Sequence, residues 1–260
     1  FDMKEGYKMV WSRQSSSPAI DLAGLEYKCL PSGLHNTSED TIMLAHNTTS
    51  LGLLYGVSKY LQNTREQHEH ADSADSSGTI STDRLKVKMY SLGILCKELL
   101  PTSWKPNRFL CNGWEYIELL ELVLGDFMAG HDYGNFEAFD RFFDVISSLE
   151  LNSNAYYVPR ISNHPVTRLS SYFHTLGPLV FVVAKQALLR KKVLFLQQNG
   201  SKVSNLDAGS FVYLTMLLSL VPQELNLVES VNEPMKYSTP LYNVVLHDLA
   251  DSISLFGQTS

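Results

Sequence analysis

The sequence predicts a mixed α/β protein with two lobes: an α+β lobe with an antiparallel sheet, then an α/β lobe. In the first part of the chain, up to residue 96, short apolar runs are separated by turn residues, which is typical of an antiparallel meander. Between residues 114 and 149, apolar residues recur at helical spacing. Past residue 165, helical segments alternate with short apolar runs, the pattern of a parallel sheet.

The first lobe is expected to open with β structure. Phe1–Gly6 ends in the turn signal Lys-Glu-Gly, and Lys8–Trp11 resumes an apolar alternation. Further strands are predicted over Leu25–Leu30, Thr41–Ala45, Leu51–Tyr60 and Arg84–Cys96. Because only turns and one polar stretch separate these runs, we expect neighbouring strands to pair antiparallel.

Residues 62–83 interrupt this pattern with a polar stretch that is rich in Ser and Asp. Such a composition cannot bury enough apolar surface to order itself, so we expect a solvated, mobile insertion. His68, Glu69, His70 and Asp72 could suggest a metal site. We expect none, because a loop does not hold ligands in a closed geometry.

Two helices complete the predicted first lobe, which spans residues 1–151. Trp114–Met128 repeats apolar residues at helical spacing and places Glu115, Glu118 and Glu121 opposite them. Asn135–Leu149 has the same character, and Asn135 is a suitable N-cap.

A linker rich in Asn, Ser and Pro is predicted over residues 152–165, and the second lobe over residues 166–260. Helices are expected over Val166–Leu176, Pro178–Arg190 and Ala208–Leu220, with strands over Val193–Leu196, Leu225–Val228 and Leu241–Leu246. The strand at Val193–Leu196 is expected to be buried. The second lobe is expected to be incomplete, as part of a longer protein.

Composition excludes several classes of protein. The formal net charge is -6, which argues against nucleic-acid binding, because that needs clustered Lys and Arg. Cys29, Cys96 and Cys111 form no CxxC pair, which favours reduced thiols inside a cell. No apolar run reaches the ~18–20 residues of a transmembrane helix, and no signal peptide is visible.

No catalytic motif or phosphate-binding glycine loop occurs in the sequence, so we expect no catalytic residues, no metal and no cofactor. His164, His174 and His247 are scattered, and we expect them to cap helices or border the core. The triplet Arg190-Lys191-Lys192 suits the carboxyl end of a helix, where cations complement the helix dipole. The alternative is a contact with an acidic partner or with anionic lipid head groups.

Three segments in a fixed order carry a family resemblance. They are FHTLGPLVFVVAKQALLRKKVLFL from Phe173, SFVYLTMLLSLVP from Ser210 and TPLYNVVLHDL from Thr239. Together they resemble the central module of DENN domains, in which an aliphatic helix leads into a strand. The resemblance includes Pro240, Tyr242 and His247, whereas Val245 stands near a position where many members carry Gly.

The amino-terminal segments extend this resemblance. FDMKEGYKMVW and RLKVKMYSLGIL are similar to segments of the LCHN-type DENN proteins, although Tyr7 replaces the Asn of that pattern. The resemblance implies a longin-like first lobe and a Rossmann-like second lobe. It also implies a guanine-nucleotide exchange factor for a Rab-type small GTPase, which needs no acid, base or metal of its own.

The expected GTPase-binding surface is formed by both lobes, and the segment Tyr242–Asp248 of the second lobe is one expected contact, with Tyr242, His247 and Asp248 as candidates. The charges of Arg190, Lys191 and Lys192 make this triplet a further GTPase-contact candidate. It implies a cytoplasmic protein, with peripheral association to endosomal, Golgi or other organelle membranes. The alternative is a non-catalytic scaffold that binds a small GTPase or a second DENN or longin protein.

Overall fold

The computed structural model describes eight segments of the chain, which are the basis of every structural statement below. They are residues 6–15, 19–31, 37–63, 87–96, 113–151, 161–197, 203–221 and 237–244.

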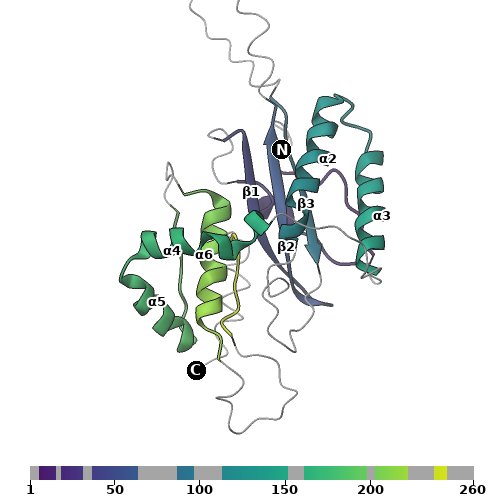
Figure 1. Ribbon diagram of the computed structural model, residues 1–260. Helices are drawn as coiled ribbons and strands as arrows, with labels where there is room; N and C mark the ends of the chain where they lie inside the picture. The colour runs from purple at the N-terminus through teal and green to yellow at the C-terminus, as the bar shows by residue number, and fades with distance from the viewer. Residues whose placement is uncertain are drawn as a thin grey trace, which may run out of the picture.

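A three-stranded antiparallel sheet forms the centre of the described structure (Figure 1). Its strands are β1 (Glu39–Thr48), β2 (Gly52–Gln62) and β3 (Met89–Cys96), in the order β1-β2-β3. The turn between β1 and β2 is tight, because Gly52 adopts a φ of 73° that side chains disfavour. The three strands predicted in these regions are confirmed, and β1 and β2 are longer than expected.

The two faces of the sheet are covered by different parts of the chain. Met43 of β1 lies opposite Val57 of β2, so both point to one face, which α2 and α6 cover. Leu44 of β1 lies on the other face, where Leu22 and Leu25 pack against it. Hence both faces are apolar and buried, as the near-continuous burial along β1 and β2 shows.

The helices predicted for the first lobe are confirmed. A short 3-10 turn, η5 (Trp114–Tyr116), leads into α2 (Ile117–Ala129), and α3 (Glu137–Leu151) follows. The side chain of Asn135 accepts a hydrogen bond from the backbone N–H of Glu137 at 3.0 Å, which stabilises the start of α3.

The second half of the described chain is helical. It contains the 3-10 turns η6 (Ile161–Asn163) and η7 (Pro165–Arg168), then α4 (Leu169–Leu176), α5 (Leu179–Leu188) and α6 (Asn205–Leu218). The three predicted helices are therefore confirmed. In Figure 1, α6 lies beside β1, and α4 and α5 lie on its outer side.

One apolar core joins the two halves of the chain. It contains Tyr55 of the sheet, Leu120 of α2, and Phe211 and Tyr213 of α6. Gly209 allows this close packing, because a Cβ there would lie 2.9 Å from the sulfur of Met43. The division into lobes at residues 151 and 166 stays a prediction.

The predicted strand at Leu25–Leu30 is wrong, because residues Leu25–Lys28 form the short helix α1. Gly24 starts it with a φ of 84°, which turns the chain sharply. The ammonium group of Lys28 then donates to the carbonyl of Ala45 at 2.9 Å. A helical turn thus places Leu25 against the sheet and anchors Lys28 to β1.

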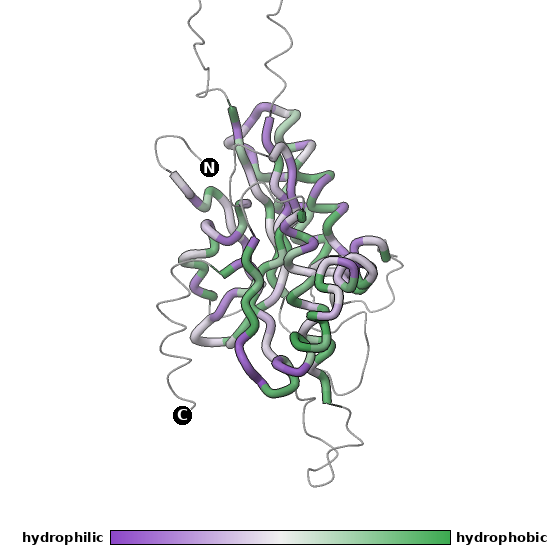
Figure 2. The backbone as a smooth tube through the Cα atoms, turned by 90° about the vertical axis from the view of Figure 1, so that its left-hand side faces the viewer, coloured by the Kyte–Doolittle hydropathy of each residue, from purple (hydrophilic) through white to green (hydrophobic). Residues whose placement is uncertain are grey.

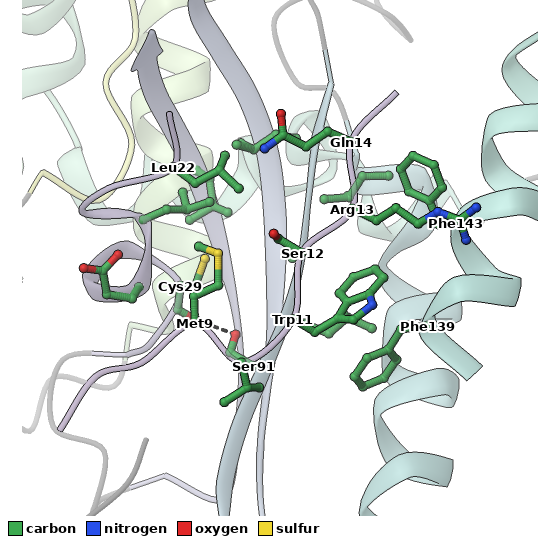
Figure 3. Close-up of a pocket in the computed structure, with 18 of the residues that line it drawn as sticks. Met9, Trp11, Ser12, Arg13, Gln14, Leu22, Cys29, Ser91, Phe139 and Phe143 are labelled. Carbon is green, nitrogen blue, oxygen red and sulfur yellow. Dashed lines mark hydrogen bonds between the residues drawn. The ribbon is translucent and has the colours of Figure 1, made fainter. Parts of the chain in front are cut away.

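The predicted strand at Lys8–Trp11 is also not formed. This segment runs near the outer edge of β3, and its side chains fix it in place (Figure 3). The rings of Trp11 and Phe139 lie 5.4 Å apart. No strand of the described chain pairs with the outer edge of β3.

The predicted buried strand at Val193–Leu196 is wrong for the described structure. This segment is extended, but Leu194 is 73% and Leu196 is 85% exposed. A strand forms only when a neighbour pairs its backbone groups, and the described residues offer none here. Residues 241–244 likewise form no strand, and Leu225–Val228 lies outside the described residues.

The predicted insertion and the predicted linker lie only partly within the described residues. β2 extends through Gln62, and residues 64–83 of the predicted insertion, including its His and Asp residues, are not described. Of the predicted linker, only residues 161–165 are described, and they contain η6. In the described segments, no helix has the length and apolar character required to cross a membrane.

Candidate functional site

Arg190 closes the carboxyl end of α5. It adopts a φ of 56°, and its backbone N–H donates to the carbonyl of Ala187 at 3.0 Å. The next N–H, that of Lys191, donates to the carbonyl of Gln186 at 2.9 Å. These two hydrogen bonds form a Schellman motif, in which Gly is the usual residue at the left-handed position. Arg190 is therefore a residue of the helix end.

The side chain of Arg190 adds contacts that a Gly would lack. Its Nη1 donates to the carbonyl of Ser219 at 2.9 Å and to the carbonyl of Ala187 at 3.3 Å. The same atom lies 3.5 Å from the hydroxyl oxygen of Ser238. Arg190 thus connects the ends of α5 and α6 to the segment at residues 237–244. Lys191 and Lys192 follow it and are exposed.

Tyr242 lies in the core rather than on the surface. It is 2% exposed, and its ring lies 5.8 Å from that of Tyr55 in an edge-on arrangement. The hydroxyl of Tyr55 donates to the carbonyl of Pro240 at 3.2 Å, and Asn243 donates to the carbonyl of Lys28 at 2.6 Å. Residues 237–244 therefore return to the sheet of the first half. The candidates His247 and Asp248 lie outside the described residues.

The outer side of α5 carries an exposed apolar surface, which we call the α5 face. Its residues lie on α5 and on the extended segment that follows: Phe181, Val182, Lys185, Leu188, Leu189, Leu194 and Leu196. Phe181 is 78% exposed, whereas Val180 and Ala187 on the opposite side of α5 are buried. A helix that is apolar on all sides is normally covered on all sides, so the α5 face indicates a binding surface.

Charge distinguishes this part of the chain from the rest. No Asp or Glu occurs between Glu150 and Asp207, although the whole chain has a formal net charge of -6. The same stretch contains Arg160, Arg168, Lys185, Arg190, Lys191, Lys192 and Lys202. Figure 2 views the molecule from the side that carries α4 and α5. Of these cations, Lys185 lies on α5, and the exposed Lys191 and Lys192 follow its carboxyl end. The α5 face therefore suits a partner that is apolar and acidic.

A second feature lies along the outer edge of β3, under the segment Lys8–Ser15, and residues of both faces of the sheet line it. A partly open cavity of about 420 Å³ is lined there by the sheet, the α1 region and α3. In Figure 3, Leu22 and Cys29 lie on one side of it, and Phe139 and Phe143 on the other.

Polar groups around this cavity are already bonded to one another. The hydroxyl of Ser91 donates to the carbonyl of Cys29 at 2.6 Å. The side chain of Gln14 accepts from the N–H of Ile20 at 2.6 Å and donates to its carbonyl at 3.1 Å. Burial raises the pKa of the Cys29 thiol to about 12, so this sulfur is a poor nucleophile. The cavity therefore offers a mainly apolar interior.

The segment Lys8–Ser15 covers this cavity and is called its roof below. Arg13 attaches this segment to α3. Its guanidinium lies 3.3 Å from Oδ1 of Asp140 and 2.8 Å from Oδ1 of Asp144. The same group lies 5.0 Å from the centre of the Phe143 ring. These contacts are partly exposed, so the roof is held by modest interactions.

Sequence reasoning found the basic triplet but neither of these two features. The absence of acidic residues between positions 150 and 207 was a signal that could have revealed the charged surface. The cavity had no comparable signal, because Arg13 and Asp140 are 127 positions apart. In the described residues, no group of His, Cys, Asp and Glu has a geometry suited to a metal ion.

The fold defines a mixed α/β protein in which one antiparallel sheet is packed by helices from both halves of the chain. The family model described as DENN domain-containing protein 11 matches residues 1–258. Because this match extends over nearly the whole chain, the protein belongs to this family of DENN-domain proteins. The closeness to the LCHN type stays a prediction.

A curated relative matches the chain over most of its length. The uncharacterized protein ANR2 of Saccharomyces cerevisiae is 27% identical over 267 residues, which cover 96% of this chain and 49% of the relative. The chain thus spans about half the length of that protein. No solved structure matches the chain significantly.

Proposed function

We propose that the protein is a DENN-type guanine-nucleotide exchange factor for a Rab-family small GTPase in membrane traffic, and that it acts by stabilising the nucleotide-free GTPase. Membership in the DENN-domain family supports this proposal. The observation that carries it in the structure is the α5 face, an exposed apolar surface in a stretch without acidic residues. A GTPase that presents an apolar and acidic surface would bury both the exposed leucines and the charges of Lys191 and Lys192.

Exchange by this route needs only differential binding. A factor that binds the nucleotide-free GTPase more tightly than the nucleotide-bound form lowers the affinity of the GTPase for nucleotide. Nucleotide lowers the affinity of the GTPase for the factor by the same ratio. The proposed GTPase contacts are Lys191 and Lys192 at the surface, and His247 and Asp248 further along the chain. Arg190 and Tyr242 would support this surface from inside, because their side chains contact the protein itself.

The direct test is release of fluorescent GDP from a panel of purified Rab proteins when the full-length protein is added. We expect acceleration for at least one of them, and tighter binding to its nucleotide-free form than to its GDP form. The double reversal Lys191→Glu and Lys192→Glu should slow this release, because it replaces attraction by repulsion.

Arg141→Glu is the matched control, since Arg141 is an exposed cation on α3, away from the α5 face. Equal activity of the double reversal and the control would exclude the triplet as a contact. No acceleration for any Rab protein would exclude the exchange function.

The second candidate function is a non-catalytic scaffold that binds a small GTPase or another DENN protein at an organelle membrane. The α5 face is equally suited to such a partner, because its apolar side chains are exposed. Addition of GTP separates the two functions. An exchange complex should dissociate when GTP enters, whereas a scaffold complex should persist in a pull-down.

A further inference from the structure

The segment at residues 237–244 starts against the carboxyl end of α5. The hydroxyl of Ser238 donates to the carbonyl of Ala187 at 2.8 Å, and its backbone N–H donates to the hydroxyl of Ser219 at 2.7 Å. Val244 follows Ser238 by six positions, which can span at most roughly 20–22 Å. The residues after 244 therefore begin within a short distance of the α5 face.

Residues 245–256 carry apolar side chains at helical spacing. Leu246, Leu249, Ile253 and Phe256 recur at intervals of three and four positions, so a helix over this stretch would present them on one side. Such a helix would be roughly 18 Å long, at about 1.5 Å per residue. The ten residues of α5 extend over about 15 Å by the same rule. The apolar row is thus long enough to cover α5.

The charges of this stretch are opposite to those of the α5 face. Residues 245–256 contain Asp248 and Asp251 but no Lys or Arg. The α5 face contains Lys185, and the exposed Lys191 follows α5. A second copy of the same face is a poorer occupant, because a two-fold contact would bring like charges together.

The face and the tether both favour an occupant from the same chain. In Figure 1, α5 lies on the outer side of α6, and within the described structure Phe181 is 78% exposed. A binding segment on a short tether has an effective concentration in the millimolar range. Weak apolar and ionic contacts are therefore sufficient to keep such a segment bound.

We propose that residues 245–256 bind as a helix to the α5 face of the same chain. The apolar row covers Phe181 and Val182, and the carboxylate of Asp251 pairs with the ammonium of Lys185. The bound segment hides the apolar surface from other partners.

This contact would regulate the proposed exchange function, and that consequence alone rests on the proposed function. The GTPase-contact candidates His247 and Asp248 lie in the same stretch as the covering residues. Release of the segment would therefore expose the α5 face and free these two candidates in one step. Exchange activity would depend on the fraction of molecules in which the segment is released.

Thiol labelling of the full-length protein tests whether the face is covered. Within the described structure, Val182 is 53% and Leu122, on α2, is 63% exposed. Val182→Cys should react with a maleimide at least about tenfold more slowly than Leu122→Cys, because labelling there must wait for release of the segment. Peptide mass spectrometry measures each position separately from the native thiols. Equal rates would overturn the proposal.

A photo-cross-linker identifies what covers the face. Benzoyl-phenylalanine in place of Phe181 keeps an aromatic ring at the most exposed position of α5. We expect it to capture a peptide within residues 245–256, in a product that runs as a monomer on a denaturing gel. Capture of any other peptide, whether from residues 222–236, a second copy or another protein, would overturn the proposal. Absence of a captured peptide would do the same.

A charge exchange tests the predicted ion pair. Asp251→Lys should raise the labelling rate at Val182→Cys roughly two- to fivefold, the range expected for one partly exposed pair, and Lys185→Asp should do the same. The double variant should return to slow labelling, because the pair is restored with its charges exchanged. Additive effects of the two substitutions would exclude the pair.

The exchange assay is kept separate from these measurements. If both proposals hold, Asp251→Lys should also accelerate release of fluorescent GDP from the responsive Rab protein. Labelling and cross-linking involve no GTPase, so a failed exchange assay leaves the contact established. Failed cross-linking, in turn, leaves the exchange function open to its own test.

Discussion

At Gly56 of β2, the absence of a side chain allows β2 to approach β3. A Cβ at this position would lie 1.8 Å from the carbonyl oxygen of Ile94, which is backbone and cannot rotate away. We expect Gly56→Ala to destabilise the protein by at least about 2 kcal/mol, because the sheet itself must shift. Urea unfolding followed by circular dichroism measures this change.

Gly125→Ala is the control for that substitution. Gly125 lies within α2 with open space around its Cα, so Ala should stabilise the protein by about 0.5–1 kcal/mol through helix propensity. Similar small effects for both substitutions would contradict the close approach at Gly56.

Cys29 makes the free energy of unfolding depend on pH in the alkaline range. Burial raises the pKa of its thiol from 9.0 to about 12, and this effect outweighs the hydrogen bond with Ser58 that lowers it. The unfolded chain releases the proton near pH 9 while the folded protein retains it, so the free energy of unfolding falls between pH 9 and 12. Cys29→Ala should flatten this decline in urea titrations at several pH values.

Cys96→Ala serves as the comparison, since it removes a thiol from β3 and keeps Cys29. Tyr60 contributes in the same direction as Cys29, because burial raises its pKa to about 12. A residual decline is therefore expected in Cys29→Ala. An unchanged profile would show that the thiol is not enclosed.

Among the elements, α6 depends on its first turn. The hydroxyl of Ser204 accepts from the N–H of Asp207 at 3.0 Å, and the carboxylate of Asp207 lies 3.3 Å from Nε of Arg168 in η7. Ser204→Ala should cost about 1 kcal/mol of stability, and Ser204→Gly only a few tenths, because Gly also suits this position. Thermal or urea unfolding distinguishes the two, and equal effects would exclude the cap.

The sequence predicts elements well where the periodicity and the environment agree. Strands β1 to β3 and helices α2 to α6 follow from runs of apolar residues and from capping residues such as Asn135. The helix α1 was missed, although Leu25, Lys28 and Cys29 have helical spacing, because the run is too short for the pattern to decide. Val193–Leu196 has the composition of a buried strand, but pairing depends on a neighbour that composition does not specify.

Sites are harder to predict than elements for the same reason. The basic triplet is visible in the sequence, but only the structure separates Arg190, which bonds to carbonyls, from the exposed Lys191 and Lys192. The cavity requires Trp11, Leu44 and Phe139 to meet, and no local pattern encodes that encounter.

At the scale of the whole molecule, the two halves of the described chain share one core. Tyr213 of α6 is fully buried in the same cluster as Val57 of β2, and Asn205 donates to Asp40 at 2.6 Å. Separately expressed fragments 1–151 and 161–260 should therefore associate when mixed, and each alone should bind a hydrophobic dye. Size-exclusion chromatography measures this association.

Gly209 provides the matched test of that prediction. Gly209→Leu would clash with Met43 and should weaken the association of the fragments, whereas Gly125→Leu should not. Fragments that remain separate and fold independently would instead establish two autonomous lobes.

The roof over the cavity also has a consequence for synthesis of the chain. Arg13 pairs with Asp144, which leaves the ribosome 131 residues later. At about 5–20 residues per second, the segment waits roughly 7–26 seconds for its partner on α3. During that interval Trp11 has no Phe139 to pack against, so the nascent chain offers an early apolar site that chaperones can bind. Closure of this segment is accordingly expected to be a late step of folding, after α3 has docked.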